Sequence, residues 1–466
     1  MVILCLFAGL YFSFGTRFVQ VRRLRTMARL LFSTDKKQKT GITSFQAFAM
    51  ALSGRVGTGN IVGVATAIGY GGPGAIVWMW IIAFFGAGTA FAESTLAQIY
   101  KEEHNGQFRG GPAYFIEKGL KCKWLAFLFA ICGVIGMGLL MPPVQCNGIA
   151  ISCVNTFGIK PYIAGIVVAA LIGLVIIGGV KRIANVAQVV APFMAILYVL
   201  LAIIVLICKA KLVPEAFMDM IRSAFGFNEV LGGILGSTIA WGVKRGIYSN
   251  EAGQGTGAIV AGAAKVSHPV KQGLVQAFSV YVDTLLVCTA TALMILACKT
   301  YNVYDATGNI LIASPEISMG APDVSYTSAA LGSVLGVNWG NIIITSALFF
   351  FAFTTIMAYY YYAETNLVYL FSRKKNRKKV EKAVIWVLRI STIIAVFFGS
   401  LFEAKTMWDL GDIGVGTMAW INIIAILLLS PKAFKTLRSY EKQEKEGKEP
   451  KFNPKEIGIE NADFWE

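Results

Sequence analysis

The chain has 466 residues, of which 56% are hydrophobic and only 15% are charged, and its formal net charge at pH 7 is +16. Soluble domains carry roughly 25% charged residues, so this composition excludes a soluble globular protein. The positive charges lie between long apolar runs, as in membrane proteins with a basic inner side, and we therefore expect no nucleic-acid partner. The chain is predicted to be an all-α polytopic membrane protein whose main surroundings are the lipid bilayer.

Apolar runs long enough to cross a bilayer recur along the chain, for example Tyr162–Val180 and Ala191–Ile207. A transmembrane helix needs ~20 such residues. We predict about eleven spans, with approximate boundaries at 1–16, 43–70, 75–99, 124–155, 161–180, 185–208, 231–262, 272–298, 339–371, 383–402 and 408–430. Residues 18–32 mix apolar and basic positions at helical spacing, which predicts an interfacial amphipathic helix.

These spans divide the chain into four segments. Residues 1–42 hold the first span and the basic amphipathic segment, 43–208 and 231–430 hold five spans each, and 431–466 form a charged tail for which we expect no fold of its own. Basic residues gather in alternate connections, ending with the cluster Arg373–Lys379, whereas the longest opposite connection, 300–338, has no Lys or Arg. The positive-inside rule then predicts a plasma (inner) membrane protein with its N-terminus outside and its C-terminus in the cytoplasm.

Two spans, the second and the seventh, are interrupted by glycines and polar residues. The second contains SGRVGTGNIVG (Ser53–Gly63), and the middle of the seventh carries Gly242, Lys244–Gly246, Asn250, Glu251 and Gly253. A charge at the centre of a lipid-facing helix costs about 2.5–3.5 kcal/mol, so both segments must line a cavity or be buried in protein. Because the breaks are five spans apart, the halves have opposite orientations, which is typical of an inverted repeat with its substrate site at the midplane.

The glycine-rich stretch of the second span allows several interpretations. A nucleotide-binding loop needs a βαβ unit, and a potassium filter needs four copies around one axis. Helix packing accounts for Gly59 and Gly63 as a small-xxx-small pair, but not for Thr58 and Asn60 between further glycines. An unwound segment accounts for all of them, because the restarting helix offers N–H groups to an anion and the ending helix offers carbonyl oxygens to a cation. A zwitterion together with Na⁺ satisfies both.

Two adjacent hydroxyls, Thr354 and Thr355, stand in the otherwise aromatic ninth span. They either bond back to the preceding turn of their helix or provide oxygen ligands for Na⁺. The eight cysteines show no metal-ligand spacing, and the spans contain no Ser/His, paired-Asp or HExxH pattern. We therefore expect a carrier and not an enzyme.

Five motifs in this order resemble the alanine or glycine:cation symporter family, within the amino acid–polyamine–organocation superfamily. They are GRVGTGNIVGVATAI (Gly54–Ile68), GGPGAIVWMW (Gly71–Trp80), KRGIYSNEAGQGT (Lys244–Thr256), HPVKQGLVQAF (His268–Phe278) and FAFTTIMAYYYYAETN (Phe351–Asn366). The resemblance implies the leucine-transporter-type fold, a 5+5 inverted repeat with one extra N-terminal helix. It also implies Na⁺-driven symport of small neutral amino acids by alternating access, with H⁺ used by some members.

The resemblance further implies a role for individual residues. The Na⁺ site would use the backbone oxygens of Ser53, Val56 and Phe351 with the hydroxyls of Thr354 and Thr355. The substrate carboxylate would meet backbone amides around Gly57, Thr58 and Gly59, with Gln145 pointing at the substrate and Thr355 beside it. Carbonyls near Trp241 and Gly242 would receive the ammonium group, and Met357 and Tyr359 would form the wall of the side-chain pocket.

Ala358 and Tyr359 stand where some members of this family have Gly-Trp. The change alters the pocket's volume and adds a hydroxyl, so serine and glutamine stay candidate substrates beside alanine and glycine. An H⁺-coupled or exchange-type amino acid carrier remains the alternative function, with an ion channel a remote one, and no obligate protein partner is evident. Arg55 and Glu251 lie on the two broken helices and are predicted to pair, either as a gate or as a static contact. The role of Asp283 is left open: it is either a proton-binding site or a member of a hydrogen-bond network.

Overall fold

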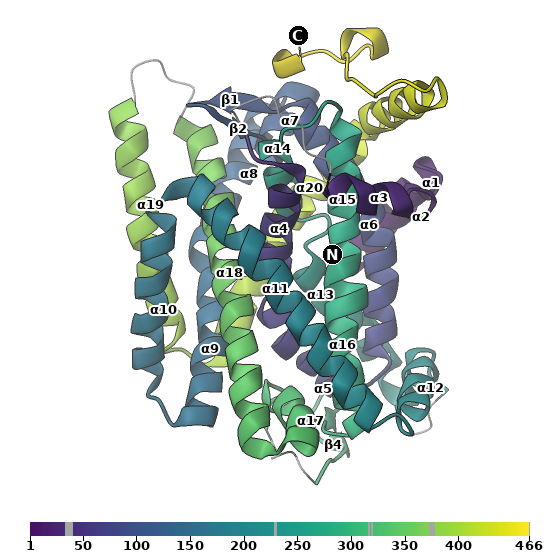
Figure 1. Ribbon diagram of the computed structural model, residues 1–466, viewed down its shortest axis with the longest axis vertical. Helices are drawn as coiled ribbons and strands as arrows, with labels where there is room; N and C mark the ends of the chain where they lie inside the picture. Colours follow the sequence, from purple (N-terminus) through teal and green to yellow (C-terminus); the bar gives the residue numbers. More distant parts are fainter. Residues whose placement is uncertain (33–40, 228–230, 316, 318–319, 372–377, 466) are drawn as a thin grey trace.

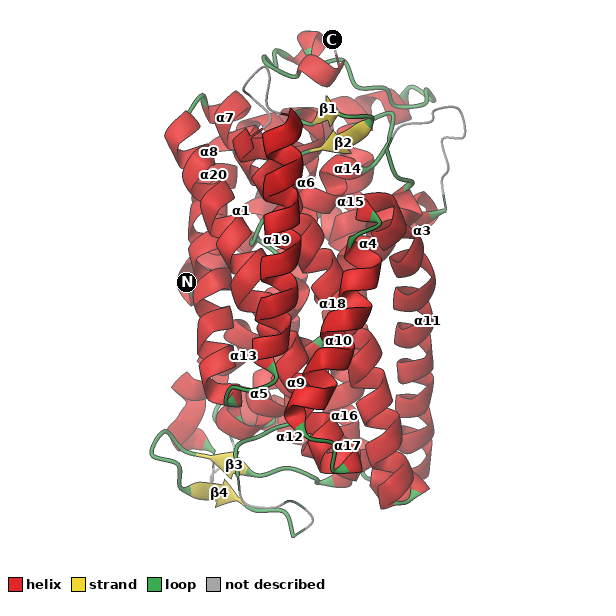
Figure 2. Ribbon diagram, turned by 90° about the vertical axis from the view of Figure 1, so that its left-hand side faces the viewer, coloured by secondary structure: helices red, strands yellow, loops and turns green. Residues whose placement is uncertain are grey.

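Long apolar helices run along the main axis of the protein, as Figure 1 and Figure 2 show. The computed structural model describes residues 1–32, 41–227, 231–315, 317, 320–371 and 378–465. Residues 373–377 of the basic cluster used to predict the orientation therefore lie outside the described residues. We call the end of the bundle that carries the chain's last residues the C-terminal end, and the other the opposite end (Figure 1).

The first half of the chain begins with helix α1 (Val2–Gly15), followed by α2 (Val19–Arg22) and α3 (Leu24–Leu31) where an amphipathic helix is predicted. Its remaining elements are α4 (Ser44–Arg55), the π-helical turn η1 (Gly59–Gly63), α5 (Val64–Gly71), α6 (Ala75–Ile99), a hairpin of β1 (Glu102–His104) and β2 (Gln107–Arg109), α7 (Pro112–Leu120), α8 (Lys123–Ile135), η2 (Gly136–Leu140), α9 (Met141–Phe157), α10 (Pro161–Ile176) and α11 (Gly179–Cys208). In the hairpin, which is antiparallel, Glu102 lies opposite Arg109.

The second half begins after α12 (Val213–Ala224). It comprises η3 (Gly232–Ile234), α13 (Leu235–Asn250), α14 (Thr256–Ala263), α15 (Pro269–Val280), η4 (Tyr281–Cys288), α16 (Thr289–Cys298), a hairpin of β3 (Val303–Tyr304) and β4 (Ile310–Ile312), α17 (Ser325–Leu335), α18 (Val337–Phe371), α19 (Lys378–Gly399), α20 (Ala404–Lys445), η5 (Lys455–Ile457) and η6 (Asp463–Trp465). The hairpin β3–β4 lies at the opposite end, far from β1–β2 (Figure 2).

Within the described residues, seven helical runs are long and apolar enough to cross a membrane, and two shorter apolar helices, α1 and α10, accompany them. The seven are Ala75–Ile99, Lys123–Phe157, Gly179–Cys208, Pro269–Cys298, Val337–Phe371, Lys379–Gly399 and Ala404–Lys445. The polytopic all-α class is thus confirmed, whereas the count of eleven spans stays a prediction.

The first predicted break is present where the glycines indicated it. Helix α4 ends at Arg55, and Val56 takes an extended conformation (φ −81°, ψ 91°) before the chain turns helical again. Every residue from Arg55 to Gly63 is buried. The backbone groups that lose their helical partners in this unwound segment therefore face protein and not lipid.

The second break lies at the end of the predicted stretch, at Glu251 and Gly253, and not at Gly242 or Gly246. Helix α13 runs without interruption through Gly242 and Gly246, and the chain leaves helical geometry only at Glu251–Gly255. The reason is packing: a Cβ on Gly242 would overlap the backbone of Ala75 in α6, so this glycine permits two helices to touch. The true break instead has Glu251, Gly253 and Gly255 at positive φ, a conformation that glycine adopts without cost.

At the C-terminal end of the bundle, the outer parts of the two broken helices are joined directly. Ile42, just before α4, forms a parallel bridge with Ala264, just after α14. The Ile42 N–H donates to Ala263 O (3.2 Å) and the Lys265 N–H donates to Ile42 O (2.9 Å). These bonds hold the two segments together at this end.

The charged tail is more ordered than the composition predicts. Helix α20 continues past Pro431 to Lys445, and the following chain folds back over the C-terminal end. Its apolar side chains explain the difference, because Phe452, Ile459 and Ala462 are buried in the main core cluster. Residues 446–465 thus pack against the bundle instead of extending into solvent.

Candidate functional site

The oxygen atoms predicted to hold Na⁺ lie together beside the first break. The Thr355 hydroxyl of α18 is 2.8 Å from Ser53 O, 3.2 Å from Val56 O and 2.9 Å from Phe351 O. A hydroxyl has one hydrogen to donate, so it cannot satisfy three carbonyl oxygens at once. The cluster therefore has more acceptors than donors, which is the chemistry of a hard-cation site.

Thr354 behaves differently from its neighbour. Its hydroxyl bonds back to Phe350 O (3.0 Å) and Phe351 O (3.1 Å) within α18. Both threonines bond back to the preceding turn, because Thr355 also lies 2.9 Å from Phe351 O, but only Thr355 reaches across to α4. Their role as Na⁺ ligands stays a prediction. Thr354 still shares the oxygen of Phe351 with the cluster, so the five predicted ligands are brought together.

Gln145 meets the restarting helix from α9. Its Oε1 accepts from the Thr58 backbone N–H (3.0 Å) and from the Thr58 hydroxyl (3.1 Å). Gly57 lies between this carboxamide and Thr355, where an added Cβ would be 2.8 Å from Gln145 Oε1 and 2.6 Å from Thr355 Oγ1. Gly57, Thr58, Gln145 and Thr355 thus form one cluster, as the sequence predicts.

The predicted contacts at Trp241 and Gly242 are wrong in detail. Both residues lie inside the unbroken helix α13, whose carbonyls there accept helical N–H groups and are not free for an ammonium group. The Trp241 ring instead stacks on Tyr70, with centroids 4.9 Å apart. Two turns further along α13, Tyr248 and Ser249 approach the first break: a Cβ on Gly59 would be 3.3 Å from Tyr248 Cδ1 and 3.4 Å from Ser249 Cα.

The two residues predicted to wall the side-chain pocket lie on different sides of α18. Tyr359 follows Thr355 by one helical turn and so shares its face, and its side chain is buried. Met357 is two residues from Thr355, which is roughly 200° around the helix. The helix geometry thus brings Tyr359 to the side of the break and turns Met357, which is also buried, away from it.

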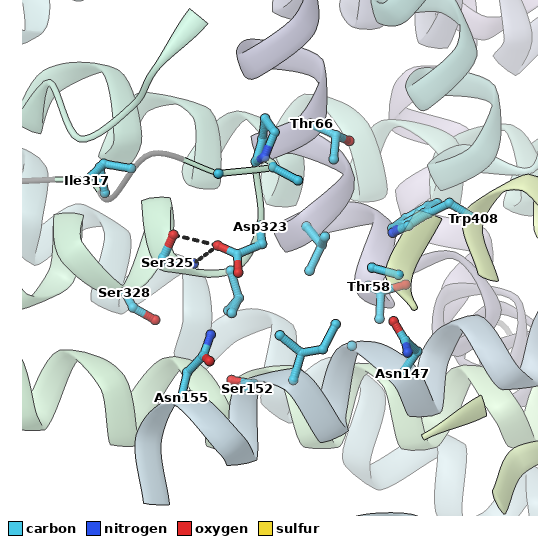
Figure 3. Close-up of a pocket in the computed structure, with 18 of the residues that line it drawn as sticks. Thr58, Thr66, Asn147, Ser152, Asn155, Ile317, Asp323, Ser325, Ser328 and Trp408 are labelled. Carbon is cyan, nitrogen blue, oxygen red and sulfur yellow. Dashed lines mark hydrogen bonds between the residues drawn. The ribbon is translucent and has the colours of Figure 1, made fainter. Parts of the chain in front are cut away.

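A cavity of about 1410 Å³ leads to the break from the opposite end. Figure 3 shows Thr58 and Trp408 on one side of it and Asp323 and Ser325 on the other, with Ser152 and Asn155 along its lower edge. The lining extends from the buried Thr58 to the exposed Lys405. The break is therefore accessible from the opposite end, while the Ile42–Ala264 bridge joins the two broken helices at the C-terminal end.

Arg55 and Glu251 approach each other's helices but form no ion pair within 4 Å, which corrects the predicted pairing. Arg55 Nη1 donates to Gln276 O (3.2 Å) and to the Ser279 hydroxyl, both on α15. Glu251 accepts instead from Thr256 (3.0 Å) in the first turn of α14. Each side chain thus finds a nearer partner on the helix against which it packs; a gating role of either residue stays a prediction.

The sequence interpretation missed how Asn60 is used. Its Oδ1 accepts from the Gly57 N–H (2.8 Å), and its Nδ2 donates to Asp283 Oδ1 (2.7 Å). The signal was an amide side chain just after the glycines of a break, which is typical of local capping. Asp283 itself lies in a network, one of the two roles left open for it.

Comparison with known proteins decides the family. A family model described as "Sodium:alanine symporter family" matches residues 1–454. The chain belongs to the sodium:alanine symporter family. The family consists of transporters, so the predictions that the protein is a coupled symporter and not an enzyme are confirmed at the level of the family.

Relatives and solved structures agree with this assignment. The carrier protein YrbD of Bacillus subtilis (strain 168) is 53% identical to this symporter, covering 98% of this chain and 93% of that protein. The sodium/proton-dependent alanine carrier protein of Bacillus sp. (strain PS3) is 47% identical, covering 94% and 96%. A Na⁺-coupled sialic acid symporter in a substrate-bound outward-open state has a TM-score of 0.52 at 13% identity, covering 89% of this chain and 87% of that one. This structural likeness shows the fold alone and confirms the leucine-transporter type.

Proposed function

We propose that this symporter carries alanine, or a similarly small neutral amino acid, into the cell together with Na⁺ by alternating access. The observation that carries the proposal is the Thr355 hydroxyl among the carbonyl oxygens of Ser53 and Val56, directly beside the amides of Gly57 and Thr58. The relatives named as alanine carriers support the choice of substrate.

The first break fits Na⁺ because its ligands are neutral oxygens. Ser53, Val56 and Phe351 would contribute carbonyls, and Thr354 and Thr355 would contribute hydroxyls. Oxygen ligands without thiolate or imidazole suit a hard cation. The carbonyls of Ser53 and Val56 also stand at the negative end of the α4 dipole, which favours a positive ion.

The same break fits a carboxylate on its other side. The amides of Thr58 and Gly59 begin the second half-helix, where N–H groups and the helix dipole favour an anion. Gln145 Oε1 accepts the Thr58 N–H at 3.0 Å and would yield it to the substrate, since a carboxylate is the stronger acceptor. The carboxamide of Gln145 could then turn its NH₂ donors to the same carboxylate.

The ammonium group would face the end of α13 instead of Trp241. The last carbonyls of that helix, before the break at Glu251, lack helical donors and lie at a negative dipole end. Tyr248 and Ser249 bring this helix end against Gly59. Na⁺ and carboxylate would thus hold adjacent residues of one unwound segment, and linkage makes their coupling reciprocal.

We further propose that the C-terminal end is cytoplasmic, because the basic connections Lys101–Lys123 and Lys265–Lys271 lie at that end with the tail. The N-terminus, predicted to lie outside, is found about half-way along the bundle (Figure 2). The cavity then opens to the outside. A membrane-impermeant thiol reagent tests this: a Gly308→Cys variant should be labelled in right-side-out vesicles and a Gly447→Cys variant only in inside-out ones. The exposed Cys208 is replaced by serine in both. The reverse labelling would contradict the orientation.

Transport in proteoliposomes tests the function itself. An imposed inward Na⁺ gradient should drive concentrative alanine uptake, and an imposed proton gradient alone should not. Uptake that ignores Na⁺ but follows protons would favour the H⁺-coupled alternative, and uptake that needs amino acid on both sides would favour an exchanger. Titration calorimetry with alanine, glycine, serine and glutamine, with and without Na⁺, would then rank the substrates.

A further inference from the structure

Asp283 is a fully buried carboxylate in η4. Within the described chain it forms no ion pair within 4 Å and is held by neutral donors from three elements. Asn60 Nδ2 of η1 donates at 2.7 Å, the Ser249 hydroxyl of α13 lies 3.0 Å from both carboxylate oxygens, and the neighbouring Thr284 hydroxyl donates at 2.7 Å. Such donors stabilise an ionised carboxylate in place of a counter-ion.

Asn60 links Asp283 to the first break. Its other end, Oδ1, accepts the N–H of Gly57 at 2.8 Å. In a continuous helix, the Gly57 N–H would donate to Ser53 O, four residues earlier. Asn60 therefore takes away the donor that would otherwise occupy Ser53 O, and that oxygen lies 2.8 Å from Thr355 Oγ1.

Ser249 connects the same carboxylate to the second broken helix. It lies in the last turn of α13, against Gly59, where an added Cβ would be 3.4 Å from Ser249 Cα. The Asp283 carboxylate thus bridges the two broken helices through one oxygen shared by Asn60 and Ser249.

We infer that Asp283 is a positioning residue: through Asn60 it holds Gly57 out of the α4 helix, which keeps Ser53 O free for the cation and the Thr58 amide exposed to the carboxylate. The inference rests on the proposed function for the identity of those ligands. The hydrogen bonds of Asp283 within the described residues go to Asn60, Ser249 and Thr284, so it acts on the proposed ligand sites through Asn60 and not by direct contact.

The test exchanges the two side chains that face each other. Asn60→Asp alone places two carboxylates in contact, and Asp283→Asn alone removes the charge that orients Asn60. The double exchange Asn60→Asp/Asp283→Asn restores the hydrogen bond between positions 60 and 283 in reversed polarity and keeps an acceptor for Gly57, Ser249 and Thr284. The carboxylate introduced at position 60 can accept from Gly57 and from the carboxamide introduced at position 283, while the oxygen of that carboxamide accepts from Ser249 and Thr284.

Each single variant is expected to raise the half-saturating concentrations of Na⁺ and alanine about tenfold or more, with a smaller change in maximal rate, and the double exchange to return both to within about threefold of the unmodified protein. Additive losses in the double exchange would overturn the inference. An Asp283→Asn variant that behaves like the unmodified protein would also overturn it. So would an Asp283→Asn variant that loses uptake and shifts its pH profile when the double exchange does not restore uptake, because that result would make Asp283 a proton carrier.

Two measurements keep this test separate from the proposed function and from misfolding. Na⁺ dependence of the unmodified protein reports on the proposed function alone, whereas the non-additivity in alanine half-saturation is measured whichever ion drives uptake. Ser249→Ala removes one donor from Asp283 without a new charge and should weaken alanine binding in the same direction as Asp283→Asn. If Asn60→Asp does not purify as a monodisperse protein, this variant and Asp283→Asn still decide: unchanged half-saturation in both would overturn the inference.

Discussion

Gly57 occupies a position that no other residue can fill without displacing the side chain of Thr355 or Gln145. A Cβ there would lie 2.6 Å from Thr355 Oγ1 and 2.8 Å from Gln145 Oε1. We expect Gly57→Ala to lower the specific uptake of alanine by about a hundredfold, because misplacement of binding groups by ~1 Å costs that much. Gly236→Ala is the control: nothing lies within 4 Å of its added Cβ in α13, and its uptake should be unchanged. Equal effects of the two substitutions would contradict this account.

The Thr355 hydroxyl reaches from α18 into the end of α4. Thr355→Val keeps the side chain's shape but removes one cation ligand and one donor. We expect the half-saturating Na⁺ concentration to rise about tenfold, which corresponds to ~1.4 kcal/mol. Thr417→Val, whose hydroxyl bonds only within its own helix, should leave Na⁺ dependence unchanged. Unaltered half-saturation by Na⁺ in Thr355→Val would place the ion elsewhere.

At this scale the sequence predicts the members of the site better than their partners. The threonine pair and Gln145 come together as expected because their motifs lie next to the breaks. The partner of Arg55 could not be predicted, since Gln276 O and the Ser279 hydroxyl become available only through the packing of α15 on α4. Buried cations take the nearest good acceptor, and its position depends on three-dimensional packing.

At the scale of elements, glycine has two uses that a single sequence does not distinguish. In the first broken helix it lets the chain unwind, whereas Gly242 and Gly246 let α13 approach α6 and remain helical. The distinction depends on which helix lies opposite, which is a property of the fold. Hydropathy predicts some helix bounds closely, since α6 occupies the predicted 75–99, but α20 runs from Ala404 to Lys445, well past the predicted 408–430.

The start of α15 gives a prediction on pH. His268 is buried and caps this helix by accepting from Val270 N–H (3.3 Å), and burial, with the nearby Lys271, lowers the pKa of its imidazole from 6.5 to about 3. Between pH 6.5 and pH 3 the unfolded chain therefore binds a proton that the folded chain does not. The stability contributed by neutral His268 is complete above pH 6.5 and is lost progressively as the pH falls through that window.

His268→Asn keeps a cap acceptor but removes this titration. We expect the melting temperature of the variant to fall less than that of the unmodified protein on acidification from neutral pH, as measured by thermal unfolding in detergent. A slope that is unchanged in His268→Asn would contradict the assignment.

At the scale of the whole molecule, the tail fastens the closed end. Lys101 is fully buried among Phe108, Phe464 and Trp465, with its Nζ 4.4 Å from the Phe464 ring centroid and 4.8 Å from that of Trp465. It donates to Ala264 O (3.1 Å), in the bridge that joins the broken helices, while Trp465 Nε1 donates to Gln98 O (2.9 Å). Burial lowers the pKa of Lys101 well below its ordinary value.

Removal of the Trp465 ring should therefore loosen the closed end. With Ala264→Cys as reporter, we expect Trp465→Ala to increase the rate of thiol labelling from the C-terminal side about tenfold, because local opening becomes easier. Trp124→Ala, whose side chain is largely exposed, should not change that rate. Labelling that is equally slow in both variants would mean that the bridge holds without the tail. Nothing in the composition of residues 446–465 predicts this docking, since it depends on three aromatic side chains that surround one lysine.

The size of the cavity has a consequence for inhibition. About 1410 Å³ is far more than an amino acid with a methyl side chain requires, and the extra space is bordered by Trp241 and Trp408. An amino acid extended by a bulky aromatic group could place its carboxylate at Thr58 and its ring against these tryptophans. Such a compound would keep the walls of the cavity apart. Because these walls must come together before the C-terminal end can open, the compound would inhibit the carrier without being transported.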